Sequence, residues 1–270
     1  MGIFGRDSGS ERIEDKFRIV LPLIGAHTAN VFVGEIIPVY PAPERIRAAV
    51  HGVHSPHKIG QIDIRIGSGQ RIRAELKKEK TFFLNLMSSP GSGKTTTLLR
   101  TIDTLAGKYR MGIMEADIDS SVDAKTIAET GVRTIQLHTG GMCHLDAGMS
   151  RQGLEEMRTE GLDLVVLENV GNLVCPAEFD TGAVKNAMIL SVPEGHDKPL
   201  KYPLMFSVCD ALIINKIDVL PYFDFDMDKV IGFSRRRNPN IRIFPISAKT
   251  GEGVEAWCDW LSEQVMEWKG

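Results

Sequence analysis

The eight residues Ser88-Ser89-Pro90-Gly91-Ser92-Gly93-Lys94-Thr95 directly follow an apolar run over 81–87. This order predicts a phosphate-binding loop between a buried strand and a helix over 95–106. The glycines let backbone N–H groups turn inward around an anion, and the start of the helix adds the positive end of its dipole. We expect Lys94 to reach the β- and γ-phosphates and the Thr95 hydroxyl to hold Mg²⁺. The loop predicts a nucleotide-binding chain, with Ser88 where the G-x-x-x-x-G-K-[ST] pattern has its first glycine.

Composition places the chain among ordinary globular proteins. Its 270 residues are 43% hydrophobic and 25% charged, with a net charge of −3. A balance this close to neutral does not favour a nucleic-acid partner. The apolar run over 19–26 contains a proline and is too short to cross a membrane, so no membrane partner is expected. Cysteines at 143, 175, 209 and 258 in a chain without a signal peptide predict a cytoplasmic protein, in which thiols are ligands or core residues.

The pattern of elements divides the chain into three segments. Residues 1–16 are expected to be a flexible N-terminus. Residues 17–78 predict a small β-rich domain of unknown role, with strands at 18–23, 30–39 and the alternating 62–66. Its loop with His51, His54 and His57 could bind nickel or zinc, but a solvated polar loop is the more common interpretation. Residues 79–270 are expected to form the nucleotide-binding domain.

Strands and helices alternate regularly in this third segment. Strands are expected at 82–88, 111–116, 133–137, 163–168, 188–192, 211–215 and 241–246, and helices at 95–106, 121–130, 145–160, 224–236 and 252–267. Several strands are continuously apolar, which is typical of strands buried on both faces. The fold class is therefore α/β, with a mostly parallel sheet covered by helices on both faces. In such folds ligands gather at the carboxyl ends of the strands.

Asn215-Lys216-Ile217-Asp218 follows one of these strands and predicts recognition of guanine. The Asp218 carboxylate can accept hydrogen bonds from N1–H and the 2-amino group of guanine, and adenine has neither donor. With adenine in the site, the buried carboxylate would be left unpaired. Discrimination against a base that leaves such a group unpaired reaches about 10⁴–10⁵. The segment Ser247-Ala248-Lys249, after the next strand, is expected to contact the base through its backbone. GTP is therefore expected rather than ATP.

Two further strand ends are expected to serve the phosphates. Asp117 ends the strand after the phosphate-loop helix and is placed to approach Mg²⁺, whereas Glu115 and Asp119 are expected to be solvated. Glu168-Asn169-Val170-Gly171 ends another strand, and the Gly171 amide could contact the γ-phosphate. The expected catalytic residues are Lys94, Thr95 and Asp117. The expected nucleotide-binding residues are Gly91, Ser92, Gly93, Lys94, Thr95, Thr96, Gly171, Asn215, Lys216, Asp218, Ser247, Ala248 and Lys249.

A possible metal site comes from Cys143-His144 together with Cys175. Two thiolates and an imidazole suit Zn²⁺ or Ni²⁺, and Cys175 lies only four residues after Gly171. Three ligands fill only three of the four positions of a tetrahedral site. The fourth position can stay open, or two protomers related by a two-fold axis can share their ligands. On their own, a Cys-His pair and a distant Cys are more often core and cap residues.

The order of these motifs resembles the HypB family of GTPases, which help to insert nickel into [NiFe]-hydrogenase. The resemblance covers residues 81–270. It rests on 84–95, Glu115-Ala116-Asp117, 143–147, 168–177, Lys201-Tyr202-Pro203 and 215–218. Urease-type relatives carry Cys-Pro-His, whereas here Ala177 follows Cys175-Pro176. The resemblance implies a P-loop fold of the SIMIBI type and nickel or zinc on Cys143, His144 and Cys175. It also implies a GTP-stabilised homodimer, and as partners a HypA-like nickel chaperone and the hydrogenase large-subunit precursor.

Two features depart from the family, and a third departs from related GTPases. Residues 1–142 contain no cysteine, so the cysteine-rich N-terminal nickel site of some members has no counterpart here. Members usually enter the GTPase domain through a helix, where this chain is expected to have strands. Ser89 stands where related GTPases carry a signature lysine, which predicts slow intrinsic turnover. The alternative from another class is a metal-free regulatory GTPase that acts through protein binding alone.

Overall fold

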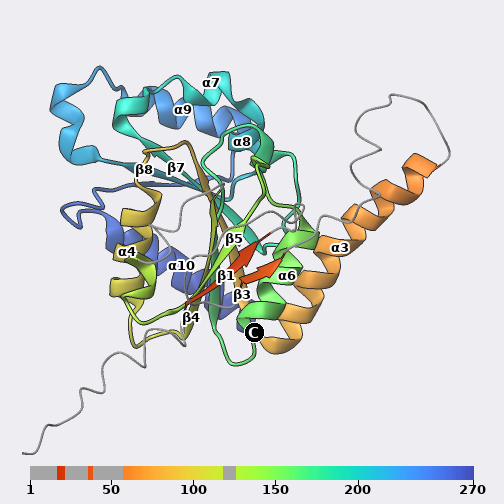
Figure 1. Cartoon of the computed structure of the whole chain (residues 1–270). Helices are drawn as coiled ribbons and strands as arrows, with labels where there is room; N and C mark the ends of the chain where they lie inside the picture. Colours follow the sequence, from red (N-terminus) through yellow and green to blue (C-terminus); the bar gives the residue numbers. More distant parts are fainter. Residues whose placement is uncertain (1–16, 22–35, 39–56, 118–125) are drawn as a thin grey trace, which may run out of the picture.

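The structure is a computed structural model that describes residues 17–21, 36–38, 57–117 and 126–270, and side chains within 67–116 and 126–270. In these ranges the chain forms one nine-stranded sheet (Figure 1), in the order β2-β1-β5-β4-β6-β3-β7-β8-β9. The strands are β1 (Phe17–Leu21), β2 (Ile36–Pro38), β3 (Phe82–Ser88), β4 (Met111–Asp117), β5 (Arg133–His138), β6 (Leu164–Glu168), β7 (Lys185–Ser191), β8 (Ala211–Asn215) and β9 (Arg242–Pro245).

All eight strand pairings among the described residues are parallel, which confirms the predicted fold class. Parallel pairing places every carboxyl end on the same edge of the sheet. β3, which leads into the phosphate loop, lies between β6 and β7 and is buried along its whole length. The loops after β3, β6 and β7 are therefore neighbours at the carboxyl edge.

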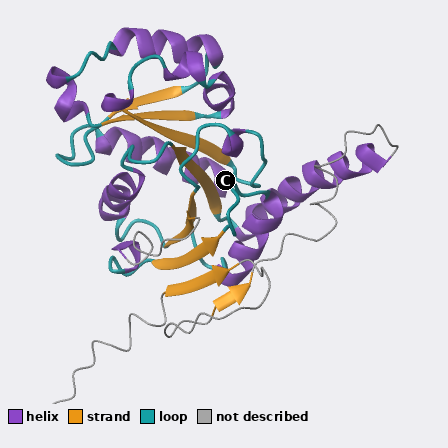
Figure 2. Ribbon diagram, turned by 45° about the horizontal axis from the view of Figure 1, so that its top comes forward, coloured by secondary structure: helices purple, strands orange, loops and turns teal. Residues whose placement is uncertain are grey.

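Helices cover both faces of the sheet (Figure 2). The α-helices are α3 (His57–Glu79), α4 (Lys94–Leu105), α6 (Ala147–Met157), α7 (Lys198–Lys201), α8 (Pro203–Val208), α9 (Met227–Arg237) and α10 (Val254–Lys269). Short 3-10 helices are η1 (Cys175–Ala177), η2 (Val192–Glu194) and η3 (Ile217–Tyr222). Side chains alternate along β3, so Leu84 packs with α4 and α10, Phe83 with α3 and α6, and Met87 with α8 and α9.

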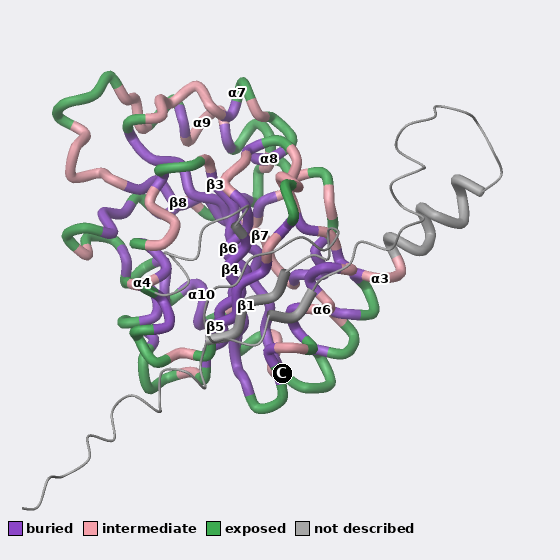
Figure 3. The backbone as a smooth tube through the Cα atoms, in the orientation of Figure 1, coloured by how far each residue is buried: buried purple, intermediate pink, exposed green. Residues whose placement is uncertain are grey.

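The central strands are buried on both faces (Figure 3). Their apolar side chains pack against rows of apolar side chains on the covering helices. α4 contributes Leu98, Ile102 and Leu105, spaced by three and four residues, to the face that α10 shares. Trp257 of α10 is 1% exposed and donates from Nε1 to the Thr101 hydroxyl at 3.0 Å. The helix that begins at the phosphate loop is thereby fixed against the sheet.

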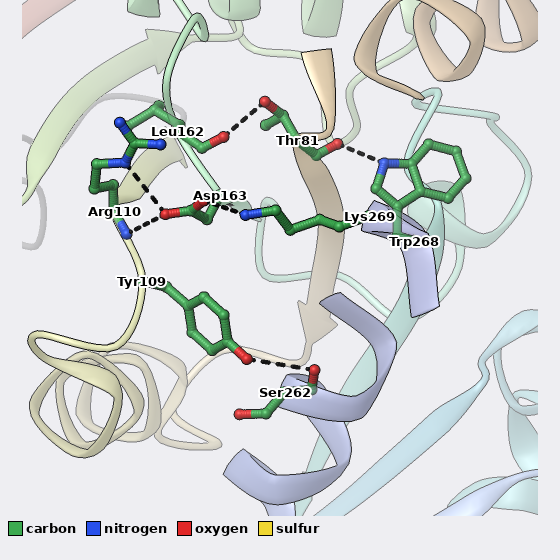
Figure 4. A network of polar contacts seen from close by, with 8 residues as sticks. All are labelled: Thr81, Tyr109, Arg110, Leu162, Asp163, Ser262, Trp268 and Lys269. Carbon is green, nitrogen blue, oxygen red and sulfur yellow. Dashed lines mark hydrogen bonds and ion pairs between the residues drawn. The ribbon is translucent and has the colours of Figure 1, made fainter. Parts of the chain in front are cut away.

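Polar contacts close the amino-terminal edge of the sheet (Figure 4). Asp163, just before β6, accepts from the backbone N–H of Arg110 at 2.8 Å and forms an ion pair with Lys269 of α10. The Trp268 Nε1 donates to the Thr81 carbonyl at 2.8 Å. Burial alone would raise the pKa of Asp163, but these hydrogen bonds from Lys269 and Arg110 lower it to about 2.

The strand predicted over 62–66 is wrong, because α3 is helical from His57 to Glu79. Isoleucines 62 and 66 are four residues apart, a spacing that fits a helix as well as an alternating strand, and Ile72 and Leu76 are also four residues apart. α3 leads directly to β3, so a helix does enter the nucleotide-binding domain, contrary to expectation. Strands were correctly predicted near β1 and β2, but β1 pairs with β5 and extends the main sheet. The division at residue 78 stays a prediction.

Candidate nucleotide and metal site

The phosphate loop joins β3 to α4 as predicted. Gly91 and Gly93 have φ values of +74° and +94°, in the left-handed region that favours glycine. A Cβ at Gly93 would also lie 2.5 Å from the Asn215 side-chain nitrogen. α4 begins at Lys94 with no side-chain cap and no acidic residue in its first turn. Its first N–H groups therefore suit an anionic ligand.

Ser88, the residue that replaces the first glycine of the pattern, is fully buried at the end of β3. Its hydroxyl donates to the Ser89 carbonyl at 2.7 Å and accepts from Lys94 Nζ at 3.1 Å. The substitution thus gives the phosphate-binding lysine a protein contact inside the loop.

Asn215 joins three loops at this edge. Its Nδ2 donates to the Ser92 carbonyl at 3.0 Å, and its Oδ1 accepts from the backbone N–H groups of Lys216 at 2.8 Å and Ala248 at 3.0 Å. Lys216 also reaches the phosphate loop, where Nζ donates to the Gly91 carbonyl at 2.7 Å. The two loops expected to bind the base are thereby attached directly to the loop expected to bind the phosphates.

The residues predicted to recognise guanine come together at η3. Asp218 is half-buried in the first turn of η3, and its Oδ1 accepts from the Ser247 hydroxyl at 2.7 Å. Ser247 is buried, and its hydroxyl also accepts from the Thr250 N–H at 3.1 Å. Lys249 is exposed at the rim. These contacts hold the Asp218 carboxylate in one orientation, as base recognition requires.

Sequence reasoning missed the role of two buried acids beside the phosphate loop. Glu168 is 2% exposed, and one of its carboxylate oxygens accepts from the Thr95 hydroxyl at 3.1 Å. Glu115 is 3% exposed and lies opposite Glu168 in the register of β4 and β6, so the prediction that it is solvated is wrong. Asp117 ends β4 as predicted, but its side chain and the whole of Asp119 lie outside the described residues. The sequence signal that could have identified Glu115 and Glu168 is a carboxylate at or near the end of an apolar strand.

The phosphate loop and the loop after β6 enclose a cavity of about 590 Å³. It is lined by Pro90, Gly91, Gly93, Lys94, Thr95, Thr96, Glu115, Ala116, Glu168, Asn169, Val170, Gly171 and Lys216. Gly171 lies against the phosphate loop, since a Cβ there would be 3.2 Å from Cγ and 3.3 Å from N of Pro90. The predicted phosphate-contacting glycine is therefore in direct contact with the phosphate loop.

Cys143, His144 and Cys175 converge within one chain. Each offers a donor atom that lies within 4.8 Å of the other two, and all three residues are half-buried. Cys143 and His144 lie in the loop between β5 and α6, as predicted, where Cys143 Sγ is 3.9 Å from His144 Nδ1. Contact with Cys143 is the main cause that raises the pKa of the Cys175 thiol, followed by burial. Two sulfurs and one imidazole nitrogen suit a soft or borderline cation.

The other two cysteines belong to the core. Cys209 and Cys258 are 0% and 1% exposed, and burial raises the pKa of both thiols, to about 11 for Cys258. They are therefore unreactive. Of the predicted histidine loop, His51 and His54 lie outside the described residues, and His57 begins α3.

A phosphate loop at the centre of a parallel sheet, next to the 215–218 segment, defines a P-loop nucleotide-binding protein of the α/β class. A family model described as "CobW/HypB/UreG, nucleotide-binding domain" matches residues 83–245. Two curated relatives are named hydrogenase maturation factor HypB. The protein from Azotobacter chroococcum mcd 1 is 48% identical over 194 residues, and that from Escherichia coli strain K12 is 45% identical over 195. This chain belongs to the HypB family, as its motifs predicted.

This chain spans about two thirds of the length of the curated relatives that it matches. The alignment with the Azotobacter protein covers 71% of this chain and 63% of that relative, and with the Escherichia protein 72% and 67%. Two solved structures are similar over nearly their whole length. HypB from Helicobacter pylori in complex with nickel gives a TM-score of 0.71 at 37% identity, covering 75% of this chain and 95% of that one. HypB from Archaeoglobus fulgidus gives 0.70 at 33% identity, with 74% and 98% covered.

Within the described part of the chain, no helix is both long enough and apolar enough to cross a membrane.

Proposed function

We propose that this chain is a GTP-hydrolysing metallochaperone that times nickel delivery during maturation of [NiFe]-hydrogenase. One observation carries the proposal. The loop after β6 touches the phosphate loop through Gly171 and, four residues later, supplies Cys175 to the cluster with Cys143 and His144. A displacement of Gly171 on γ-phosphate loss would therefore change the position of a metal ligand. The names of the similar proteins, a hydrogenase maturation factor and a nickel complex, support nickel as the cargo.

Phosphate binding would fall to Lys94 and the backbone N–H groups of the loop, including those of Gly91, Ser92, Gly93, Thr95 and Thr96. The Thr95 hydroxyl and the Glu168 carboxylate form a hard-oxygen donor set that fits Mg²⁺, and Asp117 is a predicted further ligand. Bound there, Mg²⁺ would neutralise charge on the phosphates. Among the described residues that line the cavity there is no arginine, so intrinsic turnover is expected to be slow.

The base would be selected by Asp218, with Lys216 and Asn215 holding its loop and Ser247, Ala248 and Lys249 forming the other side. Asp218 is already oriented by Ser247, which favours guanine over adenine.

Nickel, or zinc in its place, would bind Cys143, His144 and Cys175. Because three ligands leave a tetrahedral position open, the fourth would come from water, from the acceptor, or from a second protomer. We propose a homodimer in the GTP state, working in the cytoplasm with a HypA-like nickel chaperone and the hydrogenase large-subunit precursor.

The proposal is tested by linkage. The affinities of a non-hydrolysable GTP analogue and of GDP are measured with and without Ni²⁺, in the unmutated protein and in Cys175→Ala. Nickel is expected to tighten analogue binding relative to GDP by a factor within about 5–150, the usual range of coupling between sites. Cys175→Ala should lose this factor and keep its metal-free nucleotide affinity.

Cys258→Ala is the matched control, because it removes a thiol from the core and should retain the linkage. If nickel leaves both nucleotide affinities unchanged in the unmutated protein, the metal-free regulatory GTPase that acts through protein binding becomes the better account.

A further inference from the structure

α3 packs beside the helix that follows one arm of the Cys/His cluster and bonds directly to the other arm. One arm is the 139–146 loop with Cys143 and His144, which continues into α6. The other arm is the 175–183 loop, which begins at Cys175 and ends before β7. α3 and α6 lie side by side in Figures 1 and 2, and Ile72 and Leu76 of α3 share a core with Leu145 and Ala147.

The second arm is attached to α3 by a bidentate ion pair. Arg73 Nη1 and Nη2 donate to the two carboxylate oxygens of Asp180 at 2.9 and 2.8 Å. Nη1 also donates to the Ala183 carbonyl at 3.2 Å, and Asp180 accepts from the Gly182 N–H at 2.8 Å. A paired guanidinium and carboxylate fix direction as well as distance. Asp180 is therefore held in one orientation against α3.

Two glycines allow this close approach. A Cβ at Gly69 of α3 would lie 2.1 Å from an Asp180 carboxylate oxygen. Gly182 has a φ of +82°, and a Cβ there would lie 2.8 Å from the Ile72 side chain. A larger side chain at either position would displace the Asp180 carboxylate or the Ile72 side chain that lies there.

Next to Asp180 in this loop, Phe179 stacks on the imidazole of His144, with ring centroids 3.7 Å apart and an angle of 13° between planes. The stack restricts the ring to one plane, in which Nδ1 lies 3.9 Å from Cys143 Sγ. The loop that supplies Cys175 therefore also orients the imidazole ligand of the other arm.

We propose that Phe179 and the Arg73–Asp180 pair are positioning residues of the metal site, and that α3 sets its geometry by holding the 175–183 loop. The inference rests on the proposed metal role of Cys143, His144 and Cys175. Residues that orient metal ligands typically change metal affinity by about 10–100-fold when mutated. A movement of α3 would then change how tightly the cation is held.

The experiment measures Ni²⁺ affinity by competition with a chromophoric chelator, and records the Co²⁺ absorption bands as a signature of thiolate and imidazole ligation. Phe179→Leu keeps an apolar side chain but loses the flat face, and Asp180→Asn loses the charged pair. Each is expected to weaken Ni²⁺ binding about tenfold and to shift the Co²⁺ bands. Because both act through one loop, the double variant should lose less than the product of the two factors.

Arg151→Met is the matched control. It removes another ion pair of α3, with Glu75 at 3.3 Å, but leaves the 175–183 loop untouched, so metal affinity should not change. GDP affinity and thermal stability are recorded for every variant. Phe179 is half-exposed, so Phe179→Leu provides a folded test if Asp180→Asn does not fold.

Cys143→Ser separates the inference from the function beneath it. If Cys143→Ser binds Ni²⁺ as tightly as the unmutated chain, the proposed metal site is wrong and the inference falls with it. If Cys143→Ser loses binding while Phe179→Leu keeps both its affinity and its Co²⁺ bands, the site stands and the positioning role is overturned.

Discussion

The two edges of the sheet use polar side chains in opposite ways. At the amino-terminal edge, Asp163, Lys269, Arg110 and Trp268 bond to one another or to nearby backbone in a closed network (Figure 4). At the carboxyl-terminal edge, Lys94, Lys216 and Glu168 surround a cavity of about 590 Å³. The first arrangement joins the C-terminal helix to the strands, and the second leaves polar atoms facing a space that a ligand can fill.

The two edges therefore allow contributions to stability and to ligand binding to be separated. A polar group whose partners are all in the protein contributes to the free energy of unfolding, whereas one that faces a cavity contributes mainly to binding. Substitutions at the two edges should therefore affect different measurements.

The largest effect is expected for Asp218→Asn at the carboxyl edge. GTP and GDP binding should weaken by up to about 3 kcal/mol, because the new amide presents donors to the N1–H and 2-amino donors of guanine. Xanthine nucleotides should gain relative to guanine ones. The free energy of unfolding should barely change, since Asn can still accept from Ser247. Nucleotide titrations and urea unfolding decide it, and an unchanged GTP affinity would contradict base recognition by Asp218.

A smaller effect, on the free energy of unfolding, is expected for Asp163→Asn at the amino-terminal edge. The pKa of Asp163 is lowered to about 2 in the folded chain, against about 4 in an unfolded one. Its stabilisation, about 2 kcal/mol, is therefore complete above pH 4 and is lost as the pH falls through about 2. Urea unfolding should show that Asp163→Asn is less stable than the unmutated protein by this amount at pH 7. The difference between the two free energies of unfolding should shrink as the pH falls from 4 to 2. Guanine-nucleotide affinity should stay unchanged. A difference that is constant with pH would assign the loss to packing instead.

The smallest effect is expected for Arg100→Met, an exposed position on α4. Arg100 Nε and Nη2 donate to the carbonyls of Ala248 and Lys249 at 2.9 and 3.0 Å, so the phosphate-loop helix holds a loop that is expected to contact the base. Losing both bonds should weaken GDP binding by about 1 kcal/mol, or roughly fivefold, with turnover at saturating GTP unchanged. Lys108→Met, which removes a cation bonded to Ser262 at the other edge, is the control. Equal GDP affinities in the two variants would remove Arg100 from base recognition.

The sequence was most informative where chemistry requires fixed residue types at fixed spacing. The phosphate loop, Asn215-Lys216-Ile217-Asp218, and the Cys143-His144 junction all occupy the elements predicted for them. Continuous apolar strands were sufficient to predict a parallel sheet. The contact between Glu168 and Thr95 was not predictable in the same way, because it depends on β6 lying next to β3. No local sequence pattern specifies the order of the strands in a sheet.

Two errors have local causes. The alternating isoleucines at 62–66 fit both periodicities, and the helix is decided by packing further along, where Ile72 and Leu76 enter the core. α7 and α8 were not predicted, since Pro199 and Pro203 lie at their first turns and resemble loop signals when read without context. The network in Figure 4 was beyond local reasoning, because Thr81 and Trp268 are 187 residues apart.

The side-chain amide of Asn215 has a consequence for the kinetics of binding. It bonds to the phosphate loop and to both loops expected to contact the base, through protein contacts alone. The conformational entropy of these loops is therefore lost when the chain folds, rather than when a nucleotide arrives. Association should then proceed as it does with a rigid receptor, at a rate set by encounter, and differences in affinity among guanine nucleotides should appear mainly in how fast each one leaves.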